Sequence, residues 1–300
     1  MAKVSIIGSG YVGASIGQLL LGKNDVIFYD INKELIERLK NDGYKATDDI
    51  TEAMGKSDVS FICVPTPTKD GKIDLSYIKS ATEAVGKQLK QKDTYHLVVV
   101  KSTVIPTTTE TIVKEILENY SGKVCGKDFG LCASPEFLTQ VNKTTTDPEL
   151  KRWYEANPFS IKKFEDKIVI GEYDHKSGEV LEELFKPLNV PIFRTDAKTA
   201  EMIKYAHNLN LASKISYWNE LFLICQAFGI DSKKVAEIVS TDNRIGKYGT
   251  VHGKAFGGNC LPKDLEAFVS FLKERNVETK GLEAVLDINN FMSKKYGVRE

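Results

Sequence analysis

A glycine-rich turn near the amino terminus restricts the possible folds of this chain more than any other segment. The apolar run Lys3–Ile7 leads into Gly8-Ser9-Gly10-Tyr11-Val12-Gly13, and apolar residues at helical spacing continue to Leu21. This order predicts a strand, a tight turn and a helix. Glycines at this spacing allow the turn, let a phosphate approach the backbone, and let the helix pack closely on the strand. We therefore expect a dinucleotide pyrophosphate to bind at the amino terminus of this helix.

An acidic residue follows the second apolar run, Val26–Tyr29. Asp30 is placed to accept hydrogen bonds from an adenosine ribose. Because its charge would repel a phosphate on that ribose, the sequence predicts NAD rather than NADP as the cofactor. The alternative is that Asp30 merely caps the helix expected over residues 32–39. Lys33 is a further candidate for a cofactor contact.

Apolar runs continue to alternate with polar segments that are long enough for crossover helices. This alternation predicts a parallel sheet with helices on both faces, the doubly wound Rossmann fold, over residues 1–195. We interpret the polar stretch 143–166 as a surface insertion. The further strand candidates are Val59–Val64, Leu97–Val100, Phe129–Cys132 and Ile168–Ile170.

Two of these runs are followed by polar segments at the carboxyl edge of the predicted sheet, where ligands bind. One segment contains Val64, Pro65 and Thr66, and the other contains Ser102 and Thr103. We expect both segments to line the cofactor cleft. Ordinary turn chemistry, with proline and hydroxyl caps, is the alternative for either segment taken alone.

The pattern changes after residue 195. One long helical pattern runs from Ala197 to Phe228 without proline or glycine. Shorter helices are expected over residues 232–239, 263–274 and 282–296, with a glycine-rich loop over 242–260. The sequence therefore predicts an all-helical second domain, residues 196–300, built on one long helix.

The charge balance argues against a polyanionic partner. Acidic and basic residues are equal at 41 each, and there is no long basic tract. We therefore expect a small ligand and neither nucleic acid nor membrane as a partner. No secretory signal pattern and no apolar run of spanning length is present, so the sequence predicts a cytosolic protein.

The five cysteines show no spacing typical of a metal site or a disulfide framework. Four lie in apolar surroundings, which indicates inert core thiols. Cys260 differs, because it stands between the pair Gly257-Gly258 and Pro262, which begins a helix. A helix amino terminus and the nearby Lys263 both favour the thiolate, so we expect Cys260 to be a reactive nucleophile.

A lysine and an asparagine are four residues apart on the expected long helix. Lys204 and Asn208 therefore project from one face, where they would stabilise an oxyanion. The alternative for the pair alone is a solvated lysine and an amide on the helix surface. Asp264, four residues after Cys260, would share a helix face with it.

Several separate motifs agree in order and spacing with one enzyme family. They are Gly8–Gly13, Val64–Pro67, Ser102–Val104, Ser134–Leu138, Lys204–Asn208 with Lys214–Glu220, Asp242–Gly246 and Gly257–Asp264. Through them the chain resembles the UDP-glucose and GDP-mannose dehydrogenase family over nearly its whole length. The segments Pro-Glu-Phe-Leu and Gly-Gly-x-Cys-x-Pro-Lys-Asp are the family's signatures, whereas the first motif alone would fit any dinucleotide enzyme.

The resemblance implies a four-electron oxidation of a nucleotide-sugar primary alcohol to a carboxylate, taken here as UDP-glucose to UDP-glucuronate. Two NAD would be used in succession, without a metal. Cys260 would add to the aldehyde as a thiohemiacetal, and the second oxidation would give a thioester that water hydrolyses. Lys204 with Asn208 would stabilise the oxyanions, and Asp264 would hold the water.

The resemblance also assigns the remaining residues. Glu136 and Thr103 would assist proton transfer through water. Arg244 would reach the substrate of a neighbouring subunit, which implies a homodimer, expected through the long helix. Substrate contacts are expected at Phe137, Leu138, Phe256 and Gly257, and a cofactor contact at Lys263.

The sequence departs from the family pattern at several positions. Gln140 stands where a further acidic residue is usual, and Thr107 where glycine is usual. The loop 248–255 lacks the usual aromatic and asparagine pattern, and Ala255 replaces a glycine. Relatives carry a third, nucleotide-binding domain after the helix that here ends near residue 300. We expect these changes to affect thioester hydrolysis and substrate recognition.

Two other functions fit part of the pattern. The beta-hydroxyacid dehydrogenases have a similar length and layout, and they would oxidise an alcohol once, with Lys204 as acid and base and no cysteine. A non-catalytic NAD-binding protein is the other alternative, and the altered residues would support it. Retention of activity without the Cys260 thiol would favour the first, and NADH binding without turnover the second.

Overall fold

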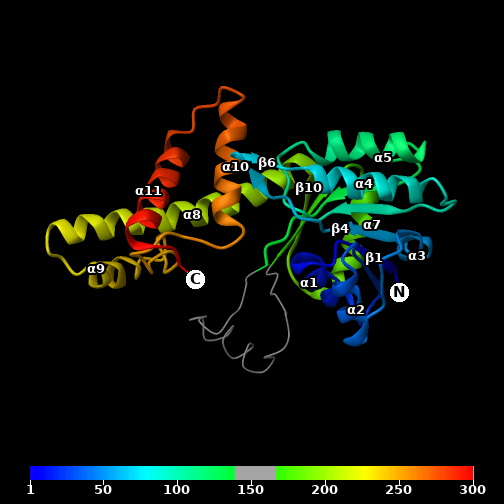
Figure 1. The fold of residues 1–300 in the computed structure, drawn as a ribbon, viewed down its shortest axis with the longest axis horizontal. Coiled ribbons are helices and arrows are strands. Elements are labelled where there is room, and N and C mark those ends of the chain that lie inside the picture. Colours follow the sequence, from blue (N-terminus) through cyan, green and yellow to red (C-terminus); the bar gives the residue numbers. More distant parts are fainter. Residues whose placement is uncertain (139–166, 300) are drawn as a thin grey trace. The chain divides into compact units, whose positions relative to one another are not determined.

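Residues 1–138 and 167–299 are described by the computed structural model, which is drawn in Figure 1. The chain forms two compact units. The first contains Met1–Thr66 and Leu75–Lys204, and the second contains Pro67–Asp74 and Tyr205–Glu300. Gln140 and the expected insertion at 143–166 lie outside the described residues. The division of the chain between residues 195 and 196 stays a prediction.

The first unit is built on a sheet that has eight strands in the described part of the chain. Their order is β10-β9-β8-β7-β4-β1-β2-β3, so that the chain adds strands in both directions from β1. This is the arrangement of a doubly wound sheet. The strands are β1 (Lys3–Ile7), β2 (Asp25–Tyr29), β3 (Ala46–Thr47), β4 (Val59–Ile62), β7 (Leu97–Val100), β8 (Gly130–Ala133), β9 (Ile168–Glu172) and β10 (Ile192–Asp196).

Helices cover both faces of this sheet. They are α1 (Tyr11–Leu20), α2 (Lys33–Asn41), α3 (Ile50–Gly55), α4 (Ser76–Leu89), the π-helical turn η1 (Thr109–Val113), α5 (Lys114–Ser121), α7 (His175–Phe185) and the short 3₁₀ turn η2 (Lys186–Leu188). Figure 1 shows α4 and α5 together on one side of the sheet.

Alternate residues of the central strands contribute to two separate apolar clusters. Ile6 and Phe61 belong to one cluster, with residues of α1, α2 and α7. Ile7 and Ile62 belong to the other, with residues of α3, α4 and α5. β7 is buried on both faces and stands in the sequence as an unbroken apolar run. β4 is apolar except for the buried Ser60, whose hydroxyl bonds to Ser5 and His96. The predicted doubly wound Rossmann fold is confirmed.

One strand pair differs from the predicted parallel sheet. β9 runs antiparallel to β8, with Ala133 opposite Gly171, while β10 is parallel to β9. The expectation of a parallel sheet is wrong for the β8–β9 pair, because an apolar run does not record the direction of its strand. The edge strand β10 was not predicted, since Phe193 is exposed and Arg194 forms an ion pair with Glu172.

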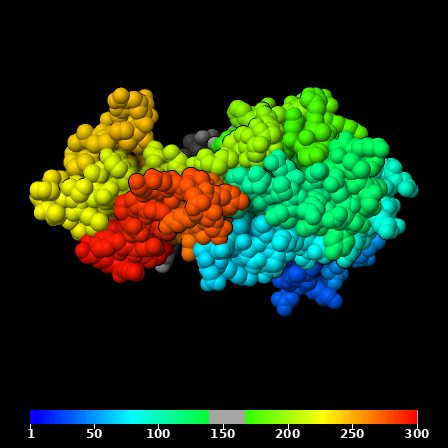
Figure 2. Space-filling view, turned by 90° about the horizontal axis from the view of Figure 1, so that it is seen from above, coloured from blue at the N-terminus to red at the C-terminus, as the bar shows by residue number. Residues whose placement is uncertain are grey.

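The second unit is helical. It contains most of α8 (Ala197–Ala227), which begins in the first unit, together with α9 (Ser232–Val239), α10 (Leu261–Lys273) and α11 (Lys280–Tyr296). Within it the ring of Tyr205 on α8 stacks on that of Phe268 on α10, with 4.5 Å between centroids. Figure 2 shows the surfaces of α10 and α11 side by side. The predicted helical region with one long helix is confirmed.

A small hairpin from the first quarter of the chain belongs to the second unit. Its strands are β5 (Thr68–Lys69) and β6 (Lys72–Ile73). The Thr68 hydroxyl donates to the carbonyl of Lys263 at 2.9 Å, and Lys72 forms an ion pair with Glu274. The sequence did not predict this hairpin, because its strands are only two residues long and its partners lie far along the chain. Among the described helices, none is long and apolar enough to cross a membrane.

Candidate active site

The glycine turn has the geometry that an anion site requires. A side chain at Gly13 would place Cβ 1.9 Å from the carbonyl oxygen of Gly8, so the third glycine is needed for packing. At Gly10 no heavy atom of residues 1–138 and 167–299 lies within 4 Å of the Cβ position, so these residues leave the approach open. No side chain caps α1, and its first turn holds no acidic residue. The first amide groups of α1 are therefore suited to a pyrophosphate.

Asp30 is connected to this turn. Its Oδ2 accepts a hydrogen bond from the backbone N–H of Ser9 at 2.8 Å, and its Oδ1 accepts one from Asn32 at 2.9 Å. The cap of α2 is Asn32, whose side chain accepts from the N–H of Leu35. The alternative role of Asp30 as the helix cap is therefore wrong. Lys33 is exposed and lies 3.7 Å from Asp48.

The two polar segments expected at the cleft are joined to each other. The Ser102 hydroxyl donates to the carbonyl of Val64 at 2.7 Å, and the Thr66 hydroxyl donates to the carbonyl of Thr103 at 2.8 Å. Val64 also lies beside the glycine turn, 3.1 Å from the position of a Cβ at Gly8. The carboxyl ends of β1, β4 and β7 thus bring three of the predicted segments together. Pro65 is exposed between them.

A buried ion pair joins Glu136 to α8. Lys204 Nζ lies 2.9 Å from Glu136 Oε1, and the exposed fractions of the two residues are 4% and 7%. Glu136 Oε2 accepts the N–H of Leu138 at 2.8 Å, and the ring of Phe137 lies 5.4 Å from Lys204 Nζ. The alternative of a solvated lysine is therefore wrong.

The ion pair determines the charge of Glu136. Burial is the largest single effect and raises the pKa of this carboxyl, whereas the charge and the hydrogen bond of Lys204 lower it. The Leu138 N–H and the charge of Lys101 act in the same direction, so the pKa lies below its usual value. Glu136 is therefore a carboxylate at neutral pH, and it accepts hydrogen bonds there rather than donating them.

A second buried polar pair lies in the second unit. Asn208, one turn after Lys204 on α8, donates from Nδ2 to Asp264 Oδ2 at 2.7 Å. Both side chains are buried, so the alternative of an amide on the helix surface is wrong. Lys263 forms an ion pair with Asp264 Oδ1. The ammonium group that we expected at the cofactor is thus held by the neighbouring carboxylate.

Cys260 occupies the position expected for a reactive thiol. It is the residue directly before α10, and Pro262 lies in the first turn of that helix. Cys260 is exposed, whereas the other four cysteines are buried, and none of the five forms a disulfide. Burial raises the pKa of Cys125 to about 12. The contrast in exposure supports the distinction between one accessible thiol and inert core thiols.

The loop that precedes Cys260 is held by residues that the sequence did not indicate. Asn289 on α11 accepts the N–H of Phe256 at 2.8 Å and donates to its carbonyl at 3.2 Å. A Cβ at Gly257 would lie 2.4 Å from the side chain of Val298. A side chain at Gly257 would therefore collide with the chain itself, and the substrate contact expected at this residue stays a prediction. At Gly258, by contrast, no heavy atom in the described part of the chain lies within 4 Å of the Cβ position.

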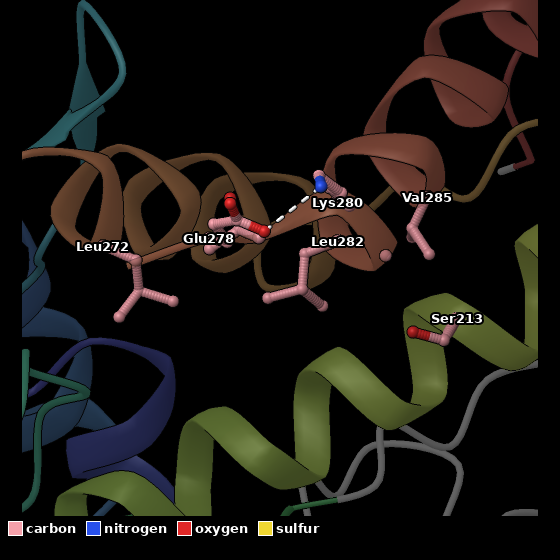
Figure 3. Close-up of a pocket in the computed structure, with 8 residues that line it drawn as sticks. Ser213, Leu272, Glu278, Lys280, Leu282 and Val285 are labelled. Atoms are coloured by element: carbon pink, nitrogen blue, oxygen red, sulfur yellow. Dashed lines mark ion pairs between the residues drawn. The ribbon is translucent and has the colours of Figure 1, made fainter. Parts of the chain in front are cut away.

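Arg244 and a surface hollow lie outside the groups of residues described above. Arg244 is 89% exposed at its side chain and bonds to Asp242 in the same turn. A hollow of about 530 Å³ lies in the second unit, and Figure 3 shows side chains that line it. Its lining contains none of the predicted site residues; it consists of Ser213, Leu272, Glu278, Thr279, Lys280, Gly281, Leu282 and Val285.

Comparison with known proteins identifies the family. Residues 39–189 match the NAD binding domain of the UDP-glucose/GDP-mannose dehydrogenase family, and residues 198–291 match its central domain. The chain belongs to this family. The resemblance expected from the sequence motifs is confirmed, and members of this family are NAD-dependent nucleotide-sugar dehydrogenases.

Individual relatives agree with this assignment. A UDP-glucose 6-dehydrogenase of Haloferax volcanii is 38% identical over 96% of this chain and 69% of its own length. The solved UDP-glucose dehydrogenase of Pyrobaculum islandicum is 34% identical, with a TM-score of 0.85 over 98% of this chain and 69% of that one. A GDP-mannose dehydrogenase from Pseudomonas aeruginosa, solved as a ternary complex, is also 34% identical, with a TM-score of 0.71 over 97% and 69% of the two chains.

Proposed function

We propose that this family member oxidises the primary alcohol of UDP-glucose to the carboxylate in two steps, through a covalent intermediate on Cys260. The observation that carries the proposal is the exposed cysteine directly before α10, four residues from the buried Asp264. UDP-glucose is proposed because the relative from H. volcanii and the structure from P. islandicum both carry that name.

The proposed reaction consists of two oxidations and one hydrolysis at Cys260. When bound, NAD supplies the acceptor for the hydride in each oxidation. After the first oxidation the Cys260 sulfur forms a bond to the aldehyde carbon, and the carbon–oxygen π bond of the aldehyde breaks. The thiol proton passes through water to the aldehyde oxygen, which gives a thiohemiacetal. After the second oxidation the product on Cys260 is a thioester. Water then adds to its carbonyl carbon, the carbon–sulfur bond breaks, and the thiol and the carboxylate are released.

The buried polar groups stabilise charge during these steps. We assign to Lys204 and Asn208 the donation of hydrogen bonds to the oxygen that becomes negative. Asp264 fixes the orientation of the Asn208 amide, because its carboxylate accepts from Nδ2. Glu136, held as a carboxylate, receives protons through water together with Thr103.

The stoichiometry of NADH formed per UDP-glucose tests this reaction, with GDP-mannose and UDP-N-acetylmannosamine as comparisons. We expect two NADH per substrate, lost in Cys260→Ala. Cys225→Ala is the matched control, since it removes a buried thiol of α8. One NADH per substrate, or unchanged turnover in Cys260→Ala, would contradict the thioester step and favour a single oxidation. NADH binding without turnover would favour a binding protein.

We also propose that the enzyme works as a homodimer through α8. Tyr217, Ile224 and Phe228 are apolar, exposed and spaced at seven and four residues, so they follow one side of the helix end. Arg244, exposed and bonded to Asp242, would then contact the substrate of the other subunit. Sedimentation of Ile224→Glu against Lys233→Glu, an exposed control on α9, tests this interface, and a wild-type monomer would contradict it.

We also propose that the protein is located in the cytosol, as expected from the sequence. A thiol that must act as a nucleophile stays reduced in a reducing compartment. Fractionation of cells that express the tagged chain tests this location.

A further inference from the structure

A buried carboxylate outside the groups described above connects α8 to the turn before α5. Glu201 is 3% exposed. Its Oε2 accepts the backbone N–H of Thr107 at 2.6 Å, and its Oε1 accepts that of Thr109 at 2.8 Å. One side chain therefore satisfies two backbone donors more than ninety residues away in the sequence.

The turn that Glu201 holds is strained. Thr107 has a φ of 85°, in the left-handed region that glycine adopts readily and a β-branched residue rarely does. Such a conformation persists only when surrounding contacts impose it, and such outliers cluster at functional sites. The two hydrogen bonds to Glu201 hold the N–H side of this turn, and the Thr107 carbonyl accepts from the N–H and the hydroxyl of Thr111.

The location of this connection links two parts of the site. Thr107 lies four residues after Thr103, whose carbonyl accepts from Thr66. Glu201 lies three residues before Lys204, which is paired with Glu136. All of these residues belong to the first unit.

We infer that Glu201 is a positioning residue, which holds the 102–109 segment, and Thr103 with it, in a fixed place relative to the turn of α8 that carries Lys204. Its effect on turnover rests on the proposed function. Its effect on the 102–109 segment does not, because that follows from the two hydrogen bonds alone.

The charge state of Glu201 gives the inference a distinctive signature. Burial raises its pKa to about 7, although the Thr109 hydroxyl and then the two backbone N–H groups oppose this, and nearby Glu110 raises it further. On α8 itself, Lys198 is exposed and Lys204 is paired with Glu136. An arrangement in which Glu201 reached water would hold the proton less tightly. A rise in pH through 7 therefore favours opening of the turn.

Amide hydrogen exchange over residues 102–113 tests the positioning directly, at pH 6 and pH 8, after correction for intrinsic rates. In the wild type we expect protection to fall between these pH values, and in Glu201→Gln this fall should disappear. In Glu201→Ala, loss of both hydrogen bonds should accelerate exchange about tenfold or more. Glu115→Gln, on the exposed face of α5, is the matched control and should behave as the wild type.

Steady-state kinetics of the same variants separates positioning from stability. For Glu201→Ala we expect kcat to fall by about tenfold to a hundredfold, while KM for the nucleotide sugar stays within about twofold. The kinetics are measured at a temperature below the unfolding transition of every variant, so that each is folded. Thr107→Gly keeps both N–H donors, so it should retain kcat. Because Thr107→Gly keeps these hydrogen bonds, we expect it to fold, and it can be measured even if Glu201→Ala does not fold.

Three outcomes would overturn the inference. They are wild-type exchange rates over 102–113 in Glu201→Ala, a kcat within about twofold of the wild type in that variant, and loss of kcat in Thr107→Gly equal to that in Glu201→Ala. If the wild type oxidised no nucleotide sugar, the proposed function would fail, and hydrogen exchange would still decide whether Glu201 positions the segment.

Discussion

The side-chain amide of Asn208 donates a 2.7 Å hydrogen bond to the carboxylate of Asp264, and both residues are buried. This contact fixes which end of the amide is presented as a donor. Since the same carboxylate also pairs with Lys263, Asp264 joins α8 to the start of the helix that follows Cys260.

Asp264→Asn should lower kcat with little loss of the fold. The new side chain offers a neutral oxygen to Asn208 and no charge to Lys263, so we expect about 1–3 kcal/mol of destabilisation. Misorientation of the donor should lower kcat on the order of a hundredfold. Steady-state kinetics and urea unfolding measure the two effects. Asp287→Asn, an exposed change on α11, is the control and should alter neither.

Lys204→Met should destabilise the protein strongly. It leaves Glu136 buried without its cation, and removal of one partner of a buried pair costs about 3–5 kcal/mol. The pKa of Glu136 should then rise, since burial would no longer be opposed by Lys204. The double variant Lys204→Met with Glu136→Gln should recover part of the loss in denaturant unfolding. A double variant less stable than Lys204→Met would contradict this account.

The ion pair between Lys204 and Glu136 should also make the free energy of unfolding decrease at acidic pH. The pKa of Glu136 is lower in the folded protein than its usual value, so its contribution is present above the unfolded pKa of about 4.3. It should be lost as pH falls through the folded pKa. Unfolding free energies of the wild type and Glu136→Gln, compared from pH 7 down to pH 3, test this, and parallel curves would argue against it.

Glu201 should change the free energy of unfolding with pH in the direction opposite to Glu136. Its folded pKa of about 7 lies above the ordinary value, so the folded state holds more protons between the two values. Its contribution is present below about pH 4 and is lost as pH rises through 7, by up to about 3 kcal/mol. The difference in unfolding free energy between the wild type and Glu201→Gln should therefore change between pH 5 and pH 8. A constant difference would count against a buried, protonated Glu201.

Thr107→Gly should stabilise the protein. Relief of the left-handed threonine should gain more than glycine costs through the entropy of the unfolded chain, with a net effect of about 0.5–1 kcal/mol. Thermal unfolding measures this gain. Thr111→Gly serves as the comparison and should destabilise, because Thr111 lies inside η1 and does not share that conformation.

Local sequence patterns predicted the elements that are buried on both faces. Lys3–Ile7 and Leu97–Val100 were predicted with their observed bounds, because a strand between two layers of helices is mostly apolar. The edge strand β10 and the hairpin β5–β6 were missed, since short or half-exposed strands leave no such run. The antiparallel direction of β9 depends on chain connections that apolar runs do not record.

The candidate site shows the same limit. Cys260 could be predicted because glycine, cysteine and proline stand together in the sequence. Glu136 came from the family resemblance, since nothing near it in the sequence indicates a pairing with Lys204. Asn289 and Glu201 were not predicted at all. Their partners are backbone groups of distant segments, and any residue type supplies those groups.

The hairpin β5–β6 affects the order in which the protein can be made. It leaves the ribosome with the first quarter of the chain, yet the carbonyl that accepts from Thr68 belongs to a residue 195 positions later. Most strands of the first sheet can pair while the chain is still growing, but the second unit must wait for its last helices before it can enclose a segment synthesised much earlier. Release of the nascent chain before α10 emerges would leave this hairpin without the helix it packs against.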